Sequence, residues 1–180
     1  MARQDTERVY DELLVTLARS GDQKAANRLA ARWYPRLMRT ALRLVRDRTE
    51  AEEAVQEAWA GICRGWPRLS DPAMFPGWAF GILRRKCVDR IRKVQTDRNR
   101  SAPLEAAPEP SQPARGELQV EIAQALAGLS DDHRLTAILY FGEGLSLNEI
   151  AAVTGVPVGT AKSRLFTARQ HLKSRLKGET

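Results

Sequence analysis

Side chains that donate hydrogen bonds crowd the segment from residue 160 to residue 177. This segment contains six lysines and arginines and no acidic residue, whereas residues 118–159 contain one arginine and five acids. Lysine and arginine bind phosphate oxygens, and neighbouring hydroxyl groups can reach base edges in a groove. The segment therefore predicts a nucleic-acid-binding surface. The alternative is an ordinary helical hairpin with a solvated basic face.

The elements around this segment form a helix-turn-helix pattern. Ser146 and Glu149 have the spacing of a capping box, which begins a first helix. Gly155 is expected to end that helix in the left-handed conformation, and Pro157 prevents its continuation. The second helix has apolar residues at spacings of three and four: Ala161, Leu165, Ala168, Leu172 and Leu176. We expect this stripe to be buried and the opposite side to face DNA.

A second cationic group lies in the N-terminal half of the chain. The expected helix 78–94 contains Arg84, Arg85, Lys86, Arg90, Arg92 and Lys93, with Asp89 as its one acid. The rings of Trp66, Phe75 and Trp78 lie before this helix or at its start. Cations for phosphates and flat rings for unpaired bases are typical of surfaces that hold a single strand. The alternative places the tryptophans in the core and leaves the cations solvated.

An acidic helix precedes the cationic one. We expect it over residues 51–64, with Thr49 as its N-cap and glutamates in its first turn, where the helix dipole favours negative charge. Its polar positions include Glu53, Gln56 and Glu57. They form either a solvated surface or a docking surface for a basic protein partner.

No motif indicates catalysis, a metal or a cofactor. The sequence contains no GxxxxGK(S/T) phosphate loop, no GxGxxG after a strand and no HExxH motif. His133 and His171 are isolated, and we expect both at the surface. Cys63 and Cys87 lack a metal-ligand spacing, and Cys87 lies on an apolar helix face, which predicts a buried, unreactive thiol. We expect a protein that is not an enzyme.

Helical periodicity accounts for the remaining elements and predicts an all-α fold. Further helices are expected over residues 7–19, 22–45 (capped by Asp22 and kinked at Pro35), 118–129 and 133–141. Residues 95–117, with four prolines, predict a flexible linker. The expected domains are therefore residues 1–94 and 118–180, joined by the linker 95–117.

The composition favours an anionic partner. The 180 residues have a formal net charge of +7 and a pI near 9.9. No apolar run approaches the roughly 18 residues of a membrane span, and the first eight residues lack the apolar core of a signal peptide. We expect a cytoplasmic protein without membrane insertion.

Three segments together resemble bacterial RNA polymerase sigma factors of the extracytoplasmic-function type, in which a linker joins sigma region 2 to sigma region 4. Residues 47–59 (DRTEAEEAVQEAW) are similar to the segment that docks on the clamp helices of the largest polymerase subunit. Residues 75–93 (FPGWAFGILRRKCVDRIRK) resemble the segment that recognises and melts the −10 element. Residues 155–165 (GVPVGTAKSRL) look like the start of the helix that reads the −35 element.

The resemblance implies a subunit that gives core RNA polymerase its promoter specificity. By similarity, the polymerase-binding residues are Asp47, Glu53, Gln56 and Glu57. The −10 residues are Trp78, Arg84, Arg85, Lys86, Asp89, Arg92 and Lys93. The −35 residues are Thr160, Lys162, Ser163, Arg164, Phe166, Thr167 and Arg169, with the two arginines nearer phosphates. The implied partners are promoter DNA, the clamp helices, the flap of the second-largest subunit and an anti-sigma factor.

The alternative function is a stand-alone helix-turn-helix regulator of transcription. A third class, a basic protein that binds RNA or a membrane surface, rests on charge alone. A regulator has no need for an acidic docking helix beside a cationic, aromatic one, so residues 47–94 favour the sigma factor. The chain departs from the family pattern at Glu53-Ala54, Arg85 and Thr167, where we expect altered docking and altered base preference.

Overall fold

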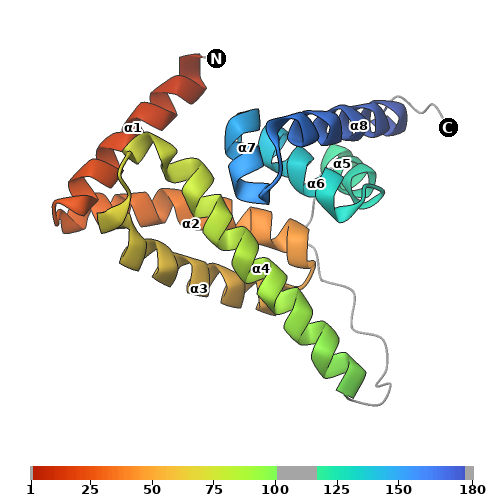
Figure 1. The fold of residues 1–180 in the computed structure, drawn as a ribbon, viewed down its shortest axis with the longest axis horizontal. Helices are drawn as coiled ribbons and strands as arrows, with labels where there is room; N and C mark the ends of the chain where they lie inside the picture. The colour runs from red at the N-terminus through yellow and green to blue at the C-terminus, as the bar shows by residue number, and fades with distance from the viewer. Residues whose placement is uncertain (1, 101–116, 177–180) are drawn as a thin grey trace. The chain divides into compact units, whose positions relative to one another are not determined.

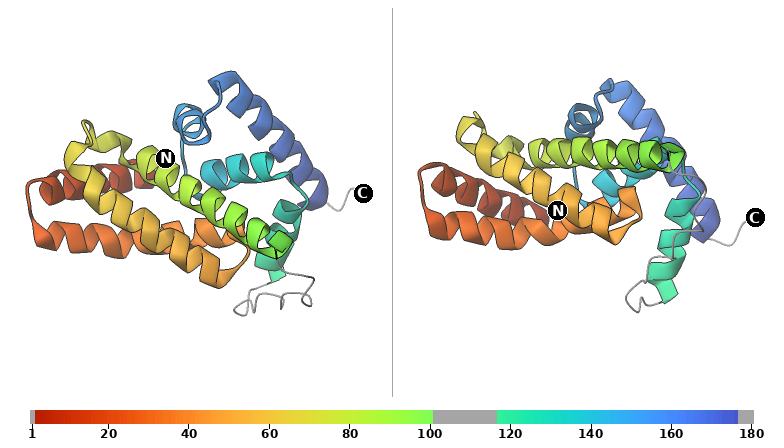
Figure 2. Two further views of the ribbon diagram at one scale, coloured as in Figure 1. Left: turned by 60° about the horizontal axis from the view of Figure 1, so that its bottom comes forward. Right: turned by 90° about the horizontal axis from the view of Figure 1, so that it is seen from below.

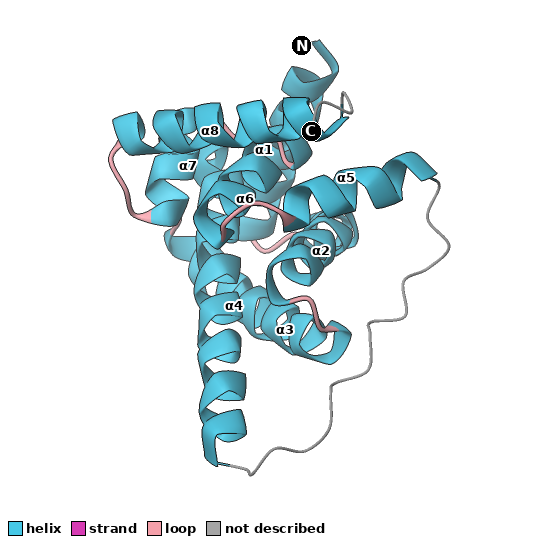
Figure 3. Cartoon of the chain, turned by 90° about the vertical axis from the view of Figure 1, so that its right-hand side faces the viewer, coloured by secondary structure: helices cyan, strands magenta, loops and turns pink. Residues whose placement is uncertain are grey.

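The computed structural model describes residues 2–100 and 117–176, and their side chains over residues 5–97 and 120–176. Within these ranges every regular element is a helix and no strand occurs (Figure 3), which confirms the predicted all-α fold. The chain divides into two compact units, Met1–Ala107 and Pro108–Thr180, hereafter unit 1 and unit 2. Each unit has its own buried apolar residues, as two small domains require.

Unit 1 is a bundle of four helices: α1 (Ala2–Arg19), α2 (Gln23–Val45), α3 (Arg48–Gly65) and α4 (Phe75–Arg100). Two short turns, η1 (Trp66–Arg68) and η2 (Pro72–Met74), join α3 to α4. Helix α1 packs against α2, while α2, α3 and α4 pack against one another (Figures 1 and 2). Trp33 of α2 is fully buried at the centre, with its ring edge-to-face with Phe75 at a centroid distance of 4.8 Å.

The helix starts of unit 1 show one correct prediction and one wrong one. Asp22 caps α2 as predicted, because its carboxylate accepts hydrogen bonds from the backbone of Lys24 and Ala25. Helix α3 is capped by Asp47 rather than Thr49, since the Asp47 carboxylate accepts from Glu50 N at 2.9 Å. The helix therefore begins at Arg48, three residues before the expected start.

Two further predictions for unit 1 concern prolines and the linker. Helix α2 continues through Pro35, and the kink expected there stays a prediction. Helix α4 continues to Arg100, so its predicted end at Val94 is wrong. Residues 95–100 contain neither proline nor glycine, and nothing in them interrupts the helix. The proline-rich part of the predicted linker, residues 101–116, lies outside the described residues.

Unit 2 contains α5 (Glu117–Ala127), α6 (Asp131–Ala137), the π-helical turn η3 (Ile138–Gly142), α7 (Leu147–Thr154) and α8 (Val158–Leu176). Helices α5, α6 and α7 all pack against α8. The predicted capping box is confirmed: Glu149 N donates to the Ser146 hydroxyl, and Ser146 N donates to the Glu149 carboxylate. Gly155 ends α7 with a φ of 71°, the left-handed conformation that favours glycine.

The apolar stripe of α8 is confirmed over most of its length. Ala161, Leu165 and Ala168 are buried, and Leu172 is half-buried against the core of unit 2. Leu176, the last residue of α8, is 42% exposed, so its predicted burial is wrong. Helical periodicity places Leu176 on the same side of α8 as the buried stripe. The apolar packing that buries the stripe does not extend to this last residue of the helix.

Candidate nucleic-acid and polymerase interfaces

The outer face of α8 presents polar and aromatic side chains to solvent. Lys162, Ser163, Phe166, Thr167 and Arg169 are all exposed, and Phe166 is 63% exposed. They alternate along the helix with the buried stripe, so the stripe holds the helix while these side chains remain accessible. A helix with one free face of donors fits the major groove of duplex DNA.

Two other predicted −35 residues of α8 already have partners inside unit 2. Arg164 forms an ion pair with Asp132 at the start of α6, and its side chain is 21% exposed. Thr160 is half-buried, and its carbonyl accepts a 2.9 Å hydrogen bond from the Ser163 hydroxyl. The predicted set is therefore contiguous on one helix, but its members do not have equal freedom to reach DNA.

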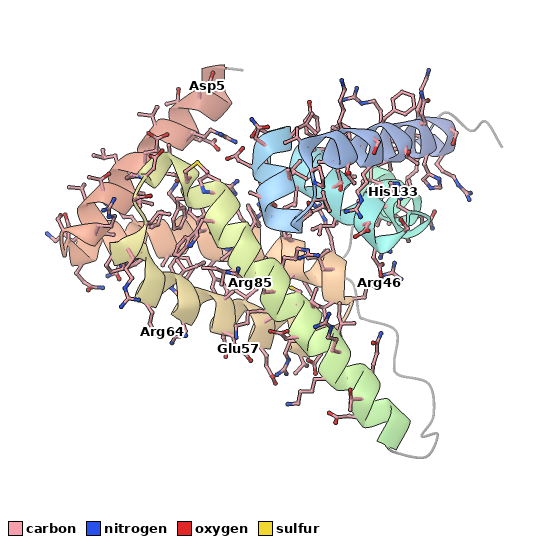
Figure 4. The ribbon with its side chains drawn as sticks, viewed as in Figure 1. Asp5, Arg46, Glu57, Arg64, Arg85 and His133 are labelled. Atoms are coloured by element: carbon pink, nitrogen blue, oxygen red, sulfur yellow. The ribbon has the colours of Figure 1, made fainter. Side chains whose placement is uncertain are left out.

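The predicted −10 residues of α4 divide between two sides of the helix. Arg85, Asp89, Arg92 and Lys93 are exposed, while Arg84 and Lys86 are half-buried. Lys86 turns toward α3, where its ammonium group lies 2.9 Å from a Glu57 carboxylate oxygen. Figure 4 labels Arg85 on α4 and Glu57 on α3. The exposed members of the predicted set are thus three cations and one acid.

Arg90 is the centre of a charge network between α3 and α4. Its guanidinium donates to Glu50 at 2.7 Å, forms an ion pair with Glu53 and lies 3.8 Å from Glu57. The Arg90 side chain is only 11% exposed. Two of the predicted polymerase-binding residues therefore also bind a cation of their own unit. The remaining predicted position on the helix, Gln56, is exposed.

The charge network between α3 and α4 was not predicted, although the sequence contains a signal for it. Glu50, Glu53 and Glu57 recur at spacings of three and four on one helix, and Lys86 and Arg90 lie four apart on the next. Such rows lie on one side of their helices. Two rows of opposite charge on neighbouring helices predict that those sides meet.

The aromatic residues near α4 are less accessible than predicted. Phe75 is fully buried against Trp33, so the prediction that its ring could stack on bases is wrong. Trp78 is half-buried, and its ring covers Gly65, where a β-carbon would lie 2.7 Å from the ring. Trp66 is half-buried, with its ring edge-to-face with Trp59 at 6.3 Å. The alternative, which placed the tryptophans in the core, is met in part, because Trp66 and Trp78 are both half-buried.

Comparison with known proteins matches both units. The family profile of Sigma-70 region 2 matches residues 29–96, and that of Sigma-70, region 4 matches residues 125–174. The chain is 31% identical over 167 residues to the ECF RNA polymerase sigma factor SigM of Mycobacterium tuberculosis, across 92% of this chain and 84% of the relative. This chain belongs to the extracytoplasmic-function (ECF) sigma factors.

Other relatives support the same family. The chain is 28% identical to the ECF RNA polymerase sigma-E factor of Escherichia coli, across 95% of this chain and 96% of the relative. It is similar to the sigma factor RpoE of Bartonella quintana, solved with the anti-sigma factor NepR, at a TM-score of 0.69 and 28% identity, across 87% of this chain and 99% of that one. CnrH, solved with the cytosolic domain of CnrY, shares the fold at a TM-score of 0.67 and 24% identity, across 95% and 99%.

The family assignment decides between the functions considered above. Sigma factors are non-enzymatic initiation factors that direct core RNA polymerase to promoters, and this one contains both regions that the role requires. A stand-alone helix-turn-helix regulator does not account for the region 2 match in unit 1. No helix in the described part of the sigma factor is long and apolar enough to cross a membrane.

The cysteines of the sigma factor lie among packed side chains. Cys87 is buried on the inner side of α4, and burial raises the pKa of its thiol to about 12. Cys63 is half-buried, and desolvation raises the pKa of its thiol as well, although the nearby Arg64 acts in the opposite direction. The predicted burial of Cys87 is therefore confirmed, and its lack of reactivity stays a prediction that the raised pKa favours.

Each of the two histidines of the sigma factor contacts a neighbouring residue of unit 2. His133 Nδ1 lies 2.6 Å from the Ser130 hydroxyl at the start of α6. His171 is half-buried, with its Nε2 against Gly128, where an added β-carbon would lie only 2.8 Å away. We expected His171 at the surface, but the edge of its ring that carries Nε2 is covered by Gly128. A glycine at this position allows the end of α5 to approach α8 closely.

Proposed function

We propose that this ECF sigma factor docks on core polymerase through α3, holds the −10 element on the exposed side of α4 and reads the −35 element with α8. The observation that carries the proposal is the separation of two exposed cationic faces onto two units, each matched by the corresponding sigma region. Two units with independent DNA-binding faces suit a promoter with two separate elements.

The docking proposal centres on Gln56 and the outer edges of its neighbours. Gln56 is exposed, while the Glu53 and Glu57 side chains are 47% and 45% exposed despite their pairing with α4. Asp47 is exposed, but its carboxylate already accepts the Glu50 backbone N–H. The clamp helices would therefore meet an acidic rim that is partly neutralised by α4, with the exposed, uncharged Gln56 between its two glutamates.

The −10 proposal uses the exposed side of α4. Arg85, Arg92 and Lys93 would bind phosphates of the opened strand, with Asp89 between them as an acceptor for base amino groups. Arg84 and Trp78 are half-buried and would contribute at the edge of this surface. Lys86 would contribute less, because Glu57 already neutralises much of its charge.

The −35 proposal follows from the outer face of α8. Lys162, Ser163, Phe166 and Thr167 would face base edges in the major groove. Arg164, Arg169 and Thr160 would lie nearer the phosphate backbone. Contact of unit 2 with the flap of the second-largest polymerase subunit would hold this helix at the −35 distance.

We also propose an anti-sigma partner and a cytoplasmic location. Support for the partner comes from the sigma factor RpoE of Bartonella quintana, which was solved in complex with the anti-sigma factor NepR. Cytoplasmic location follows from the proposed partner, since bacterial core polymerase works on chromosomal DNA.

The test is assembly followed by transcription. The purified chain is mixed with bacterial core polymerase and passed over a gel-filtration column, and we expect co-migration. The assembled enzyme is then given a random-sequence duplex library, and we expect it to select duplexes with two constant elements. A chain that fails to co-migrate, or an assembly that selects no sequence, contradicts the proposal.

A further inference from the structure

Arg164 and Arg169 of α8 contact different kinds of partner. Arg164 pairs with the Asp132 carboxylate at the start of α6. The Arg169 guanidinium carbon lies 5.7 Å from the ring centroid of Phe141, in the turn η3 that follows α6. The segment formed by α6 and η3 therefore contacts two arginines of α8, one near the start of the segment and one near its end.

These partners have opposite consequences for DNA binding. A carboxylate neutralises the guanidinium and occupies its N–H donors, so a phosphate must compete with it. An aromatic ring attracts the guanidinium to its face, but the full charge remains and the donors at the edge stay available. The ring also restricts a long side chain that would otherwise lose rotamer freedom on binding DNA. Arg169 is therefore better prepared than Arg164 to bind a phosphate.

The exposure of Phe141 depends on the π-helical turn. Glu143 N donates to the Ile138 carbonyl at 3.1 Å, a bond that spans five residues instead of four. In a regular α-helix, residues three apart share a side, and Phe141 would follow Ile138 into the core. Instead, Ile138 is 2% exposed and Phe141 is 53% exposed. Single π-helical turns within helices are frequent at functional sites.

Resting on the proposed −35 role of α8, we propose that Phe141 is a positioning residue that holds Arg169 for a phosphate contact. Phe141 acts through Arg169 and needs no contact with DNA itself. The Tyr140 ring packs edge-to-face against Phe141 at 5.1 Å and so helps to fix the ring. A competing role for an exposed ring is to bind a protein partner directly, and the experiment below separates the two.

The experiment is a double-mutant cycle between Phe141 and Arg169. The full chain, assembled with core polymerase, is titrated into a fluorescent duplex selected from the random library, over a range of KCl concentrations. We expect Phe141→Leu to weaken binding about two- to fivefold, as for an exposed cation–π contact. Phe141→Trp should bind at least as tightly as the parent, because its ring attracts cations more strongly. The plot of log affinity against log salt has a negative slope, and Arg169→Met should make that slope less negative by about 0.9.

The decisive comparison is Phe141→Leu in the Arg169→Met background, where we expect no further loss. An equal loss in both backgrounds overturns the inference and assigns Phe141 to a protein partner or to the fold. Absence of loss in the parent, or an unchanged salt slope in Arg169→Met, overturns it as well. Lys162→Met tests the proposed function separately: if it too leaves affinity and slope unchanged, α8 is not the DNA-binding helix. Hydrogen exchange of α6 and α8 amides confirms that each variant is folded.

Discussion

Arg90 of α4 donates a 2.7 Å hydrogen bond to Glu50 of α3, and the Arg90 side chain is only 11% exposed. Glu53 and Glu57 meet the same guanidinium. The helix proposed to dock on polymerase is thus joined by charge to the helix proposed to hold the −10 element. Since the Arg90 side chain is largely shielded from water, removal of this shared cation should cost more than removal of one partner of an exposed pair.

Replacing Arg90 should therefore destabilise unit 1. Arg90→Met leaves three glutamates close together without their shared cation, and we expect a loss of about 1–3 kcal/mol in the free energy of unfolding. The matched control is Arg48→Met, which breaks the exposed pair with Glu52 on the same α3 helix and should cost about 0.5 kcal/mol or less. Urea unfolding followed by tryptophan fluorescence measures both, because all four tryptophans lie between residues 33 and 78. Equal losses in the two variants would contradict a central role for Arg90.

Polymerase docking is best tested at Gln56. Gln56→Lys places a cation on the exposed rim and removes no member of the Arg90 network, and we expect affinity for core polymerase to fall about tenfold or more with little change in stability. Glu53→Lys is a less clean test, because it places a cation beside Arg90 and should also lower the stability of unit 1. Titration of labelled chain with core polymerase gives the dissociation constant, and an unchanged value for Gln56→Lys would move the docking surface elsewhere.

Two glycines near the helix turn should respond oppositely to alanine. Gly155→Ala should destabilise unit 2 by about 1 kcal/mol, because the φ of 71° disfavours any side chain even though no atom lies within 4 Å of an added β-carbon. Gly159 has the same open space but lies within α8, so Gly159→Ala should stabilise by up to about 1 kcal/mol. Hydrogen exchange of α7 and α8 amides measures both changes. Similar effects at the two positions would exclude backbone strain as the cause.

Cys87 should make stability fall at high pH. The folded protein holds the thiol proton up to about pH 12, whereas an unfolded chain releases it near the ordinary thiol pKa of 9.0. Above pH 9 the unfolded state therefore binds fewer protons, and stability declines by up to about 1.4 kcal/mol per pH unit until pH 12. Other groups titrate in this range, so the quantity to measure is the difference between the parent and Cys87→Ala in urea unfolding from pH 8 to pH 11. A constant difference would contradict the buried, protonated thiol.

Unfolding and thiol chemistry give a second check on the same residue. Cys63 is half-buried and should react slowly with an alkylating reagent in the folded protein, while Cys87 should react only after urea is added. Mass spectrometry of the labelled peptides distinguishes the two cysteines. Labelling of Cys87 in the folded protein would show that α4 opens.

The sequence by itself determined the features that depend on residues close along the chain. Ser146 with Glu149, and Gly155 before Pro157, define the start and end of α7 through hydrogen bonds and backbone angles that span a few residues. The same holds for the buried stripe of Ala161, Leu165 and Ala168, since helical periodicity alone places them on one side. The family resemblance added the order of the regions, which the comparisons confirmed.

Only the tertiary structure decided which side of each helix meets a neighbour. Periodicity gives the angles of Arg85 and Arg90 around α4, but not that α3 lies on the side of Arg90 and solvent on the side of Arg85. The sequence suggested that the Phe75 ring could stack on bases, whereas in the folded unit this ring is packed against Trp33. Phe141 and Arg169 are 28 positions apart in the sequence, and their contact forms because the π-helical turn that contains Phe141 packs near α8. Local sequence specifies how a helix divides its faces, whereas the packing of the whole unit determines what each face touches.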